Sequence, residues 1–324
     1  MENATPGRVQ ELLEVGRQRL GAIAEGQTLT HEGIRRRRRR RRVLWPYLYV
    51  LPAVGAMAFA FGYPLVQVVR ESFYVGSFAS PIWVGLDNYR GVIDDPQFRT
   101  SLQNNVKLLL AVPVMIGLGL AIALVLNDRI RGARQYQAIV FLPYVLPATA
   151  IGIAFSFLLQ QNGVLNTALR EAHLDFFAHD WLGSSHLAIV SVGGLVVWQQ
   201  LGLGVVVFTA ALLALPPDTA EAARIDGAGW WSLQLRVLVP QIRPIIGLLA
   251  VIQVITVFSW VFTYVYVLTS GGPGYASSVM ELYIWRSFST GANGTAAAVA
   301  VMLLGMASVL IGVSLWARRR AVSA

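Results

Sequence analysis

Residues 221–240, EAARIDGAGWWSLQLRVLVP, form a polar island between two long uncharged stretches of the chain. Of the 324 residues, 55% are hydrophobic and 13% are charged, whereas a soluble domain carries about 25% charged residues. The mean hydropathy of the chain is +0.56. This composition predicts an integral membrane protein in which residues 221–240 connect two membrane spans.

The connecting segment has the pattern of two short helices joined by an elbow. Prolines at 216–217 end the preceding apolar stretch, and Asp218 or Thr219 is suited to cap a new helix. Gly227 then permits a bend that a residue with a Cβ atom resists. A second helical pattern follows over residues 230–239, and we expect it to end at Pro240 and Pro244 because proline disrupts a helix interior.

Windows free of charged residues indicate six membrane-spanning helices. A helix needs about 20 mostly apolar residues to cross a bilayer. The windows are residues 43–69, 108–127, 136–160, 187–215, 244–268 and 295–316. The sequence therefore predicts an all-α membrane protein with six transmembrane helices.

Lysine and arginine are unevenly distributed between the two sides of this topology. If the N-terminus is cytoplasmic, 20 of the 26 basic residues fall on the cytoplasmic side, as the positive-inside rule requires. Both termini are therefore predicted to be cytoplasmic. We expect a basic tail at 1–42, a six-helix transmembrane domain at 43–317 that includes the loop at 216–243, and a short tail at 318–324.

Aspartate, glutamate, lysine, arginine and histidine are absent from all six windows. Proton-coupled and voltage-coupled transporters usually place such groups inside the membrane. The chain also has no cysteine, which excludes disulfides and thiolate metal sites, and it lacks the phosphate-binding pattern GxxxxGK[ST]. We therefore expect no catalytic residue, metal site or cofactor in this chain, and an energy source on a different chain.

The connecting segment resembles the EAA loop of ABC-importer permeases, in which Glu-Ala-Ala is followed by Asp-Gly-Ala, an aromatic residue and Leu-Pro. Two positions differ, because Gln234 replaces the usual phenylalanine and Val239 precedes the final proline. The matching residues, to which the resemblance assigns ATPase coupling, are Glu221, Ala222, Ala223, Asp226, Gly227, Ala228, Trp231 and Pro240.

The resemblance implies the type I ABC importer permease fold and a set of partners. In that family the loop is a coupling helix that docks in a groove of a cytoplasmic ATPase subunit. The implied partners are a second, non-identical permease, two ATP-binding cassette subunits that carry ATP and Mg, and an extracytoplasmic solute-binding protein. That last protein would contact the loops at 70–107, 161–186 and 269–294.

Three further segments resemble carbohydrate importers of the maltose/glycerol-3-phosphate class. They are VGLDNYRGVIDDPQFRTSLQNN at 84–105, FLPYVLPATAIGIAFSFLL at 141–159, and VLTSGGPGYASSVMELYIWRSF at 267–288. In the last of these, the glycines and proline at 271–273 predict a tight turn. The resemblance covers about residues 44–317 and implies the first permease of a heterodimeric pair, with a sugar or a related polyol or glycerol-phosphate as solute.

Polar and aromatic side chains within spans four and five are candidates for a substrate path near the bilayer middle. Amides and hydroxyls can hydrogen-bond sugar hydroxyls, and a tryptophan ring can stack on a pyranose. The same groups can instead join helices through interhelical hydrogen bonds. The candidates are Trp198, Gln199, Gln200, Gln253, Thr256, Ser259, Trp260, Thr263 and Tyr264.

Eight consecutive arginines precede the first span. Each basic residue near an anionic membrane surface contributes about 1 kcal/mol, so we expect this run to anchor the topology and contact membrane lipid. No aromatic residues are interleaved, so we expect no nucleic-acid partner. The residues of the run are Arg35, Arg36, Arg37, Arg38, Arg39, Arg40, Arg41 and Arg42.

Two other function classes remain open at this stage. One is a membrane receptor or scaffold whose basic tail recruits partners, and the other is an ATP-independent secondary carrier. The absence of charge from the spans argues against the carrier, and the elbowed loop argues against the scaffold.

Overall fold

The computed structural model describes residues 10, 14–18, 49–76, 80–128 and 131–323, with side chains to residue 316. These residues belong to two compact units, 1–67 and 68–324, and each unit is described by itself. The arginine run at 35–42 and residues 43–48 of the predicted first span lie outside the described residues.

The first predicted span is a continuous apolar helix from Tyr49 to Glu71 that begins in the first unit. It contains the π-helical turn η1 (Ala58–Gly62) and ends with α2 (Tyr63–Glu71). The Gln67 side-chain amide donates a hydrogen bond of 2.9 Å to the Tyr63 hydroxyl one turn earlier. The length and composition of the helix from Tyr49 to Glu71 suit a membrane crossing.

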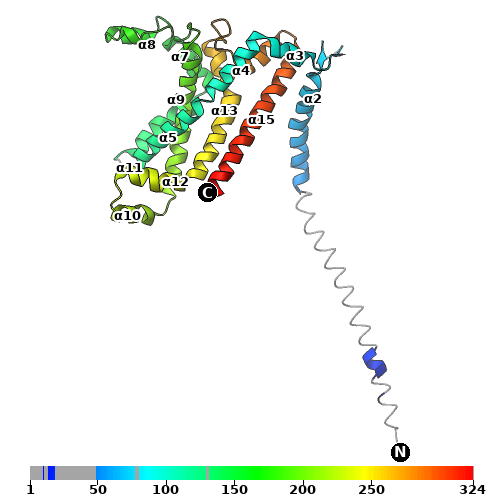
Figure 1. Cartoon of the computed structure of the whole chain (residues 1–324), viewed down its shortest axis with the longest axis vertical. Helices are drawn as coiled ribbons and strands as arrows, with labels where there is room; N and C mark the ends of the chain where they lie inside the picture. Colours follow the sequence, from blue (N-terminus) through cyan, green and yellow to red (C-terminus); the bar gives the residue numbers. More distant parts are fainter. Residues whose placement is uncertain (1–9, 11–13, 19–48, 77–79, 129–130, 324) are drawn as a thin grey trace, which may run out of the picture. The chain divides into compact units, whose positions relative to one another are not determined.

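The second unit contains the other predicted spans, whose long helices run side by side in Figure 1. Over the described part of the chain, five helices are long and apolar enough to cross a membrane, or six if one bent pair is a single span. This confirms the predicted all-α fold. The helices of the second unit's spans are α4 (Pro96–Leu108), α5 (Ala111–Asn127), α6 (Ala133–Val145), α7 (Ala148–Leu158), α9 (Leu187–Leu213), α13 (Arg243–Leu268) and α15 (Asn293–Ser323).

The second span begins earlier than predicted, because α4 and α5 together form one apolar helix from Pro96 to Asn127. Asp95 is the N-cap of α4, and its carboxylate accepts the Gln97 backbone N–H at 2.7 Å. Proline at the first helical position is favourable because no hydrogen bond needs its missing N–H. The predicted window begins at residue 108, directly after Lys107. The Asp95 cap instead begins the helix at Pro96, about three turns earlier.

The third span departs from the prediction of one spanning helix at 136–160. The helices α6 and α7 meet at an angle of 94° across a break of two residues, where Leu146 and Pro147 have extended backbones. A proline disfavours the helical conformation of the residue before it and provides no N–H of its own. The interval 136–160 is therefore two helices rather than one.

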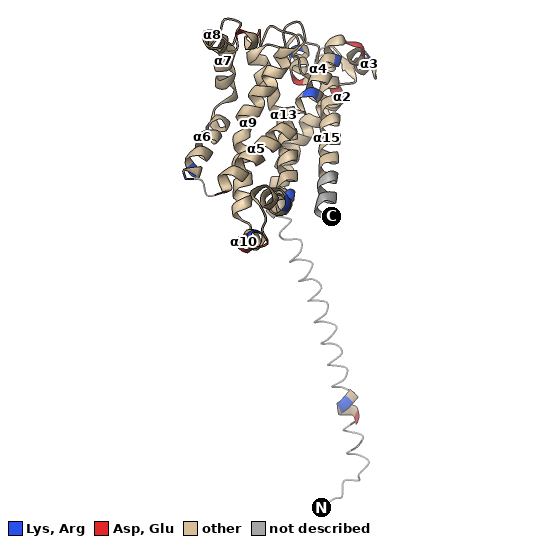
Figure 2. Ribbon diagram, turned by 60° about the vertical axis from the view of Figure 1, so that its left-hand side comes forward, with Lys and Arg blue, Asp and Glu red and all other residues tan. Residues whose placement is uncertain are grey.

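Short elements lie at both ends of the helices in the second unit, and Figure 2 shows the charged residues gathered there while the middles of the spans are uncharged. One end carries the strand pair β1 (Tyr74–Val75) and β2 (Ile82–Trp83), with α3 (Asp87–Asp94), α8 (Val164–Glu171), the 3-10 turn η2 (Asp175–Phe177) and α14 (Met280–Ser289). The other end carries α10 (Pro217–Ile225), α11 (Trp230–Ser232), the π-helical segment η3 (Leu233–Leu238) and α12 (Val239–Gln241).

The predicted turn at 271–273 is confirmed. Gly271 has φ of +78° and Gly274 has φ of +58°, a backbone region that glycine enters without a steric penalty. The Gly272 N–H donates to the Thr269 carbonyl at 2.8 Å, and the Ser277 hydroxyl donates to the Gly272 carbonyl at 2.6 Å. The turn directs the chain from α13 into α14.

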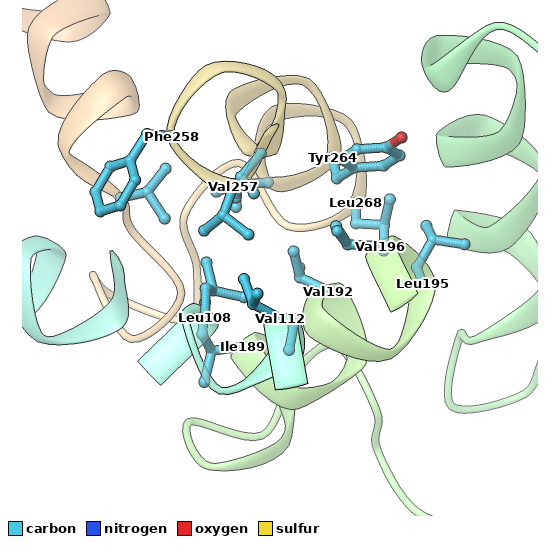
Figure 3. Packing of buried hydrophobic residues seen from close by; sticks show 14 of the residues in the cluster. Leu108, Val112, Ile189, Val192, Leu195, Val196, Val257, Phe258, Tyr264 and Leu268 are labelled. Atoms are coloured by element: carbon cyan, nitrogen blue, oxygen red, sulfur yellow. The ribbon is translucent and has the colours of Figure 1, made fainter. Parts of the chain in front are cut away.

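The main apolar core lies between α5, α9 and α13. Val112, Val192, Val196 and Val257 are buried in it, and Figure 3 shows their side chains facing one another from the three helices. The hydroxyl of Tyr264 lies at the edge of this cluster. Because lipid is as apolar as these side chains, close packing rather than water exclusion must hold the helices together.

Glycines allow the backbones of α5, α6 and α9 to approach closely. A Cβ atom added at Gly119 of α5 would lie 3.3 Å from the Cα atom of Gly204 on α9. A Cβ atom at Gly202 would lie 2.7 Å from the Cα atom of Phe141 on α6. Backbone atoms cannot move aside as a flexible side chain does, so the crossing at Gly202 requires glycine and the crossing at Gly119 leaves little room for a larger residue.

Replacement of Gly202 by leucine should therefore push α9 away from α6. We expect a loss of about 1–3 kcal/mol of stability from overpacking, seen as a lower melting temperature of the purified chain in detergent. Gly194→Leu is the matched control, since the space beside Gly194 on the same helix is open and its melting temperature should stay near wild type. Equal melting temperatures for the two variants would contradict this crossing.

Candidate coupling surface and transport path

The elbow after α10 is a complete helix-terminating motif built on Gly227. Gly227 has φ of +81°, and its N–H donates to the Arg224 carbonyl at 3.1 Å while the Ala228 N–H donates to the Ala223 carbonyl at 2.9 Å. These two backbone hydrogen bonds, from the residues that follow α10 back to carbonyls of its last turn, form the Schellman motif. They satisfy the last carbonyls of the helix. The predicted helix, elbow and helix are confirmed, and the glycine is explained by its backbone conformation.

One detail of the predicted segment is wrong. Pro216 rather than Asp218 or Thr219 occupies the N-cap of α10, which has no side-chain cap, because Pro217 already has the φ that the first helical turn requires. The second helix ends between Pro240 and Pro244, as predicted, because α12 ends at Gln241, and Pro240 itself lies inside its last turn. The preceding segment η3 is π-helical, and a π-bulge changes the hydrogen-bond spacing so that a proline can be accommodated.

The connecting segment is attached to the end of α5 through Asp128. The indole Nε1–H of Trp230 donates to one Asp128 carboxylate oxygen at 3.0 Å, and the Arg224 guanidinium lies 3.6 Å from the other. Both ion-pair partners are about half exposed, so the ion pair contributes little to stability but orients α10. The sequence alone gave no signal for Asp128, since its partners lie about 100 residues away.

The predicted coupling residues are arranged around a largely exposed surface. Ile225, Trp231 and Leu235 have relative exposures of 86%, 69% and 52%, which is unusual for large apolar side chains that do not face lipid. Of the predicted coupling residues, the exposed ones are Glu221, Ala222, Asp226, Gly227 and Trp231, and the half-buried ones are Ala223, Ala228 and Pro240.

Gln234, the position that departs from the family pattern, is buried at 1% exposure. It follows Leu233 and lies near Leu238, two members of an apolar cluster that includes Phe208 and Leu212 of α9. Among the described residues its Oε1 atom has no hydrogen-bond partner. A phenylalanine at this position would have no polar atom that needs one. The glutamine therefore weakens a contact that is otherwise apolar.

Gln199 and Tyr264 are brought together, and both face neighbouring helices. The Gln199 Nε2 donates to the Leu146 carbonyl at 2.9 Å, and the Tyr264 hydroxyl donates to the Gln199 Oε1. Both residues are buried. In this structure their polar groups are engaged within the chain, as in the interhelical alternative for these candidates.

The remaining candidates on α13 do not form one polar cluster. Gln253 is buried with its Oε1 unpartnered, and the Thr256 hydroxyl donates to the Ile252 carbonyl of its own helix at 3.0 Å. Trp260 is 59% exposed. Thr263 is half-buried, and Ser259 is exposed and lines an apolar groove between α13 and α15.

On α9, Gln200 is buried, whereas Trp198 is 41% exposed and packs at 5.1 Å against the ring of Phe155 on α7. Trp198 and Trp260 thus present aromatic rings on the surface of this single chain.

A polar cluster at the other end of the helices joins α4 to α14, and sequence reasoning did not single it out. Asn105 donates from Nδ2 to both carboxylate oxygens of Glu281 at 3.2 and 3.3 Å, and its Oδ1 accepts the Met280 N–H at 2.8 Å. Nearby, Asn104 donates to the carbonyls of Ala276 and Ser278. Burial raises the pKa of Glu281 to about 7.

The raised pKa predicts a pH-dependent stability of this cluster. The contribution of this cluster to the free energy of unfolding is fully present below about pH 4.5, the ordinary glutamate pKa. It is lost as the pH rises through about 7. The total change is on the order of 1–3 kcal/mol. Glu281→Gln keeps one oxygen that can accept from Asn105 Nδ2, and its melting temperature should vary less between pH 5 and 8 than that of the wild type. Glu171→Gln, at the exposed end of α8, should retain the wild-type pH dependence, and a similar flattening there would refute the assignment.

Comparison with known proteins agrees with this architecture. Residues 114–322 match the family model described as the inner membrane component of binding-protein-dependent transport systems. The probable ABC transporter permease protein YurN of Bacillus subtilis is 32% identical over 80% of this chain and 90% of its own length. The alpha-glucoside transport system permease protein AglF of Rhizobium meliloti is 30% identical over 85% of this chain and 82% of its own length.

A solved structure has the same fold. One chain of a bacterial ABC transporter that imports the polysaccharide alginate superposes with a TM-score of 0.75 at 24% identity, over 87% of this chain and 96% of that one. The family match covers more than half of the chain and includes the α10 elbow, α9 and α13. The chain is a multi-pass membrane protein and belongs to the family of inner membrane components of binding-protein-dependent transport systems.

Proposed function

We propose that the chain is the transmembrane permease subunit of an ATP-driven ABC importer in a bacterial inner membrane, with both termini in the cytoplasm. The observation that carries this proposal is the rigid, exposed elbow at Gly227, which joins α9 to α13 in a member of this family. The distribution of basic residues supports the orientation. The chain itself is a non-catalytic component.

The elbow is suited to transmit motion from an ATPase subunit. Helix α10 presents Glu221 and Ile225 outward, while Arg224 and Trp230 attach the segment to Asp128 at the end of α5. A displacement of α10 would therefore be transmitted to α5, α9 and α13, to which this segment is joined. A basic residue of the ATPase is the expected partner of Glu221, and loss of one partner of a buried charged pair costs about 2–5 kcal/mol.

The remaining partners follow from what this chain lacks on its own. Its sequence has no phosphate-binding loop, so ATP and Mg would bind to two separate ATP-binding cassette subunits. The exposed rings of Trp198 and Trp260 fit a path shared with a second, non-identical permease. An extracytoplasmic solute-binding protein would dock on the end that carries α3, α8 and α14, and the arginine run at 35–42 would contact membrane lipid.

The assembly is tested by purification of the tagged full chain from its native host in mild detergent. We expect an ATPase subunit and a second permease to co-purify with the wild type. The double variant Glu221→Ala, Gly227→Pro should lose the ATPase subunit while still inserting in the membrane, because proline has no N–H for the Schellman bond and cannot adopt φ of +81°.

The matched control is the double variant Asp175→Asn, Gly229→Ala, which also changes one exposed acid and one glycine. Gly229 has φ of −67° and open space beside it, so alanine fits there. This control should retain the ATPase subunit. Recovery of the wild-type chain without any ATPase would overturn the proposed function.

The proposed solute is a sugar or a related polyol or glycerol-phosphate, and the support is the alpha-glucoside transport named for AglF. The solute-binding protein that co-purifies or cross-links to the complex provides the test. We expect its melting temperature to rise with at least one compound of a panel of mono- and disaccharides, polyols and glycerol 3-phosphate, since a bound ligand stabilises the native state. A rise with amino acids or peptides alone would contradict the carbohydrate class.

A further inference from the structure

The break in the third span leaves backbone polar groups without helical partners. Pro147 has no N–H to donate, and Leu146 has an extended backbone, so the Leu146 carbonyl has no partner in the regular pattern of either helix. Within a bilayer, an irregular backbone persists only where other groups satisfy it. Something outside α6 and α7 must therefore bind this carbonyl.

The Gln199 side chain of α9 supplies that partner. Its Nε2 donates to the Leu146 carbonyl at 2.9 Å, and its Oε1 accepts the hydroxyl proton of Tyr264 from α13. Tyr264 is 1% exposed and Gln199 is 4% exposed. The two hydrogen bonds form a chain that runs from α13 through α9 to the break, and we name it the Gln199 clamp.

The two halves of the broken span pack against different helices. Gly202 of α9 lies against the backbone of Phe141 in α6, whereas a Cβ atom at Gly152 of α7 would lie 3.0 Å from a methyl carbon of Val267 on α13. A movement of α9 relative to α13 would therefore change the angle at Leu146. Residues 214–242, which we call the coupling segment, connect these same two helices.

We propose that Gln199 and Tyr264 are positioning residues that hold the break in span three as a hinge between the coupling segment and the transport path. Gln199 acts through the Leu146 carbonyl and does not need to touch the solute. The clamp itself is a property of this chain, and its link to the ATPase rests on the proposed function.

The absence of cysteine from the chain makes a distance measurement practical. Ile139 of α6 and Phe157 of α7 are 66% and 62% exposed, so cysteines at these positions can carry nitroxide labels on both sides of the break. The distance between the labels is measured by pulsed electron resonance on the full chain, purified with its partners and placed in lipid nanodiscs.

The variant Gln199→Met keeps a side chain of similar size but removes both hydrogen bonds. We expect its distance distribution to be about twofold broader than that of wild type, or shifted, because among the described residues only Gln199 hydrogen-bonds this carbonyl. Tyr264→Phe, which leaves the Gln199–Leu146 bond in place, should give a smaller change in the same direction and serves if Gln199→Met fails to fold.

Thr209→Val is the matched control, because Thr209 is a buried polar residue on the same helix whose hydroxyl has no partner. Its distance distribution should match wild type. Wild-type distributions in both Gln199→Met and Tyr264→Phe would overturn the clamp.

The link to the ATPase is tested by addition of Mg-ATP and vanadate to the same labelled samples. A hinge predicts that the distance changes in wild type and that this response is reduced in Gln199→Met, which a merely structural residue would not produce. An unchanged wild-type distance in a complex that hydrolyses ATP would overturn the hinge. If no ATPase subunit is present, the proposed function fails, while the nucleotide-free measurement still decides the clamp.

Discussion

Every backbone N–H and carbonyl group inside a bilayer needs a hydrogen-bond partner from the protein, and the rest of this structure depends on that constraint. Regular helices satisfy it within one segment, so the six apolar windows become helices. Where Pro147 interrupts the third span, the requirement passes to another helix, and the Gln199 side chain meets it at Leu146. The polar residues of the spans are best understood from this requirement before any solute is considered.

Packing inside the membrane follows from the same environment. Because lipid offers no hydrophobic driving force for helix association, the helices are held by close contact and by a few hydrogen bonds. The glycine crossings at Gly119 and Gly202 provide the close contact. The Tyr264–Gln199 bond provides a polar link at the edge of the valine core. Both kinds of contact involve α9, which is therefore the central helix of the second unit.

Outside the membrane the constraint is relaxed, and the α10 elbow can expose apolar side chains that a partner would cover. Its conformation is set locally, by Gly227 and two reversed hydrogen bonds, and its position is set by Asp128 at the end of α5. A local motif with a fixed attachment is what a coupling element requires. The same arrangement explains why one glycine at this place carries so much of the proposed function.

The sequence by itself determined the helical class, the positions of most apolar spans and the elbow at Gly227, because hydropathy, proline and glycine act over a few neighbouring residues. It did not determine the N-cap at Asp95, the accommodation of Pro240 or the 94° break at Pro147. At these places hydropathy carries no information, or the preferences of neighbouring residues favour different structures. Only the tertiary structure decided that Gln199 meets Leu146, that Trp230 meets Asp128 and that Asn105 meets Glu281. Each pair is separated by between 53 and 176 residues, and only the packing of the helices brings such partners within hydrogen-bond distance.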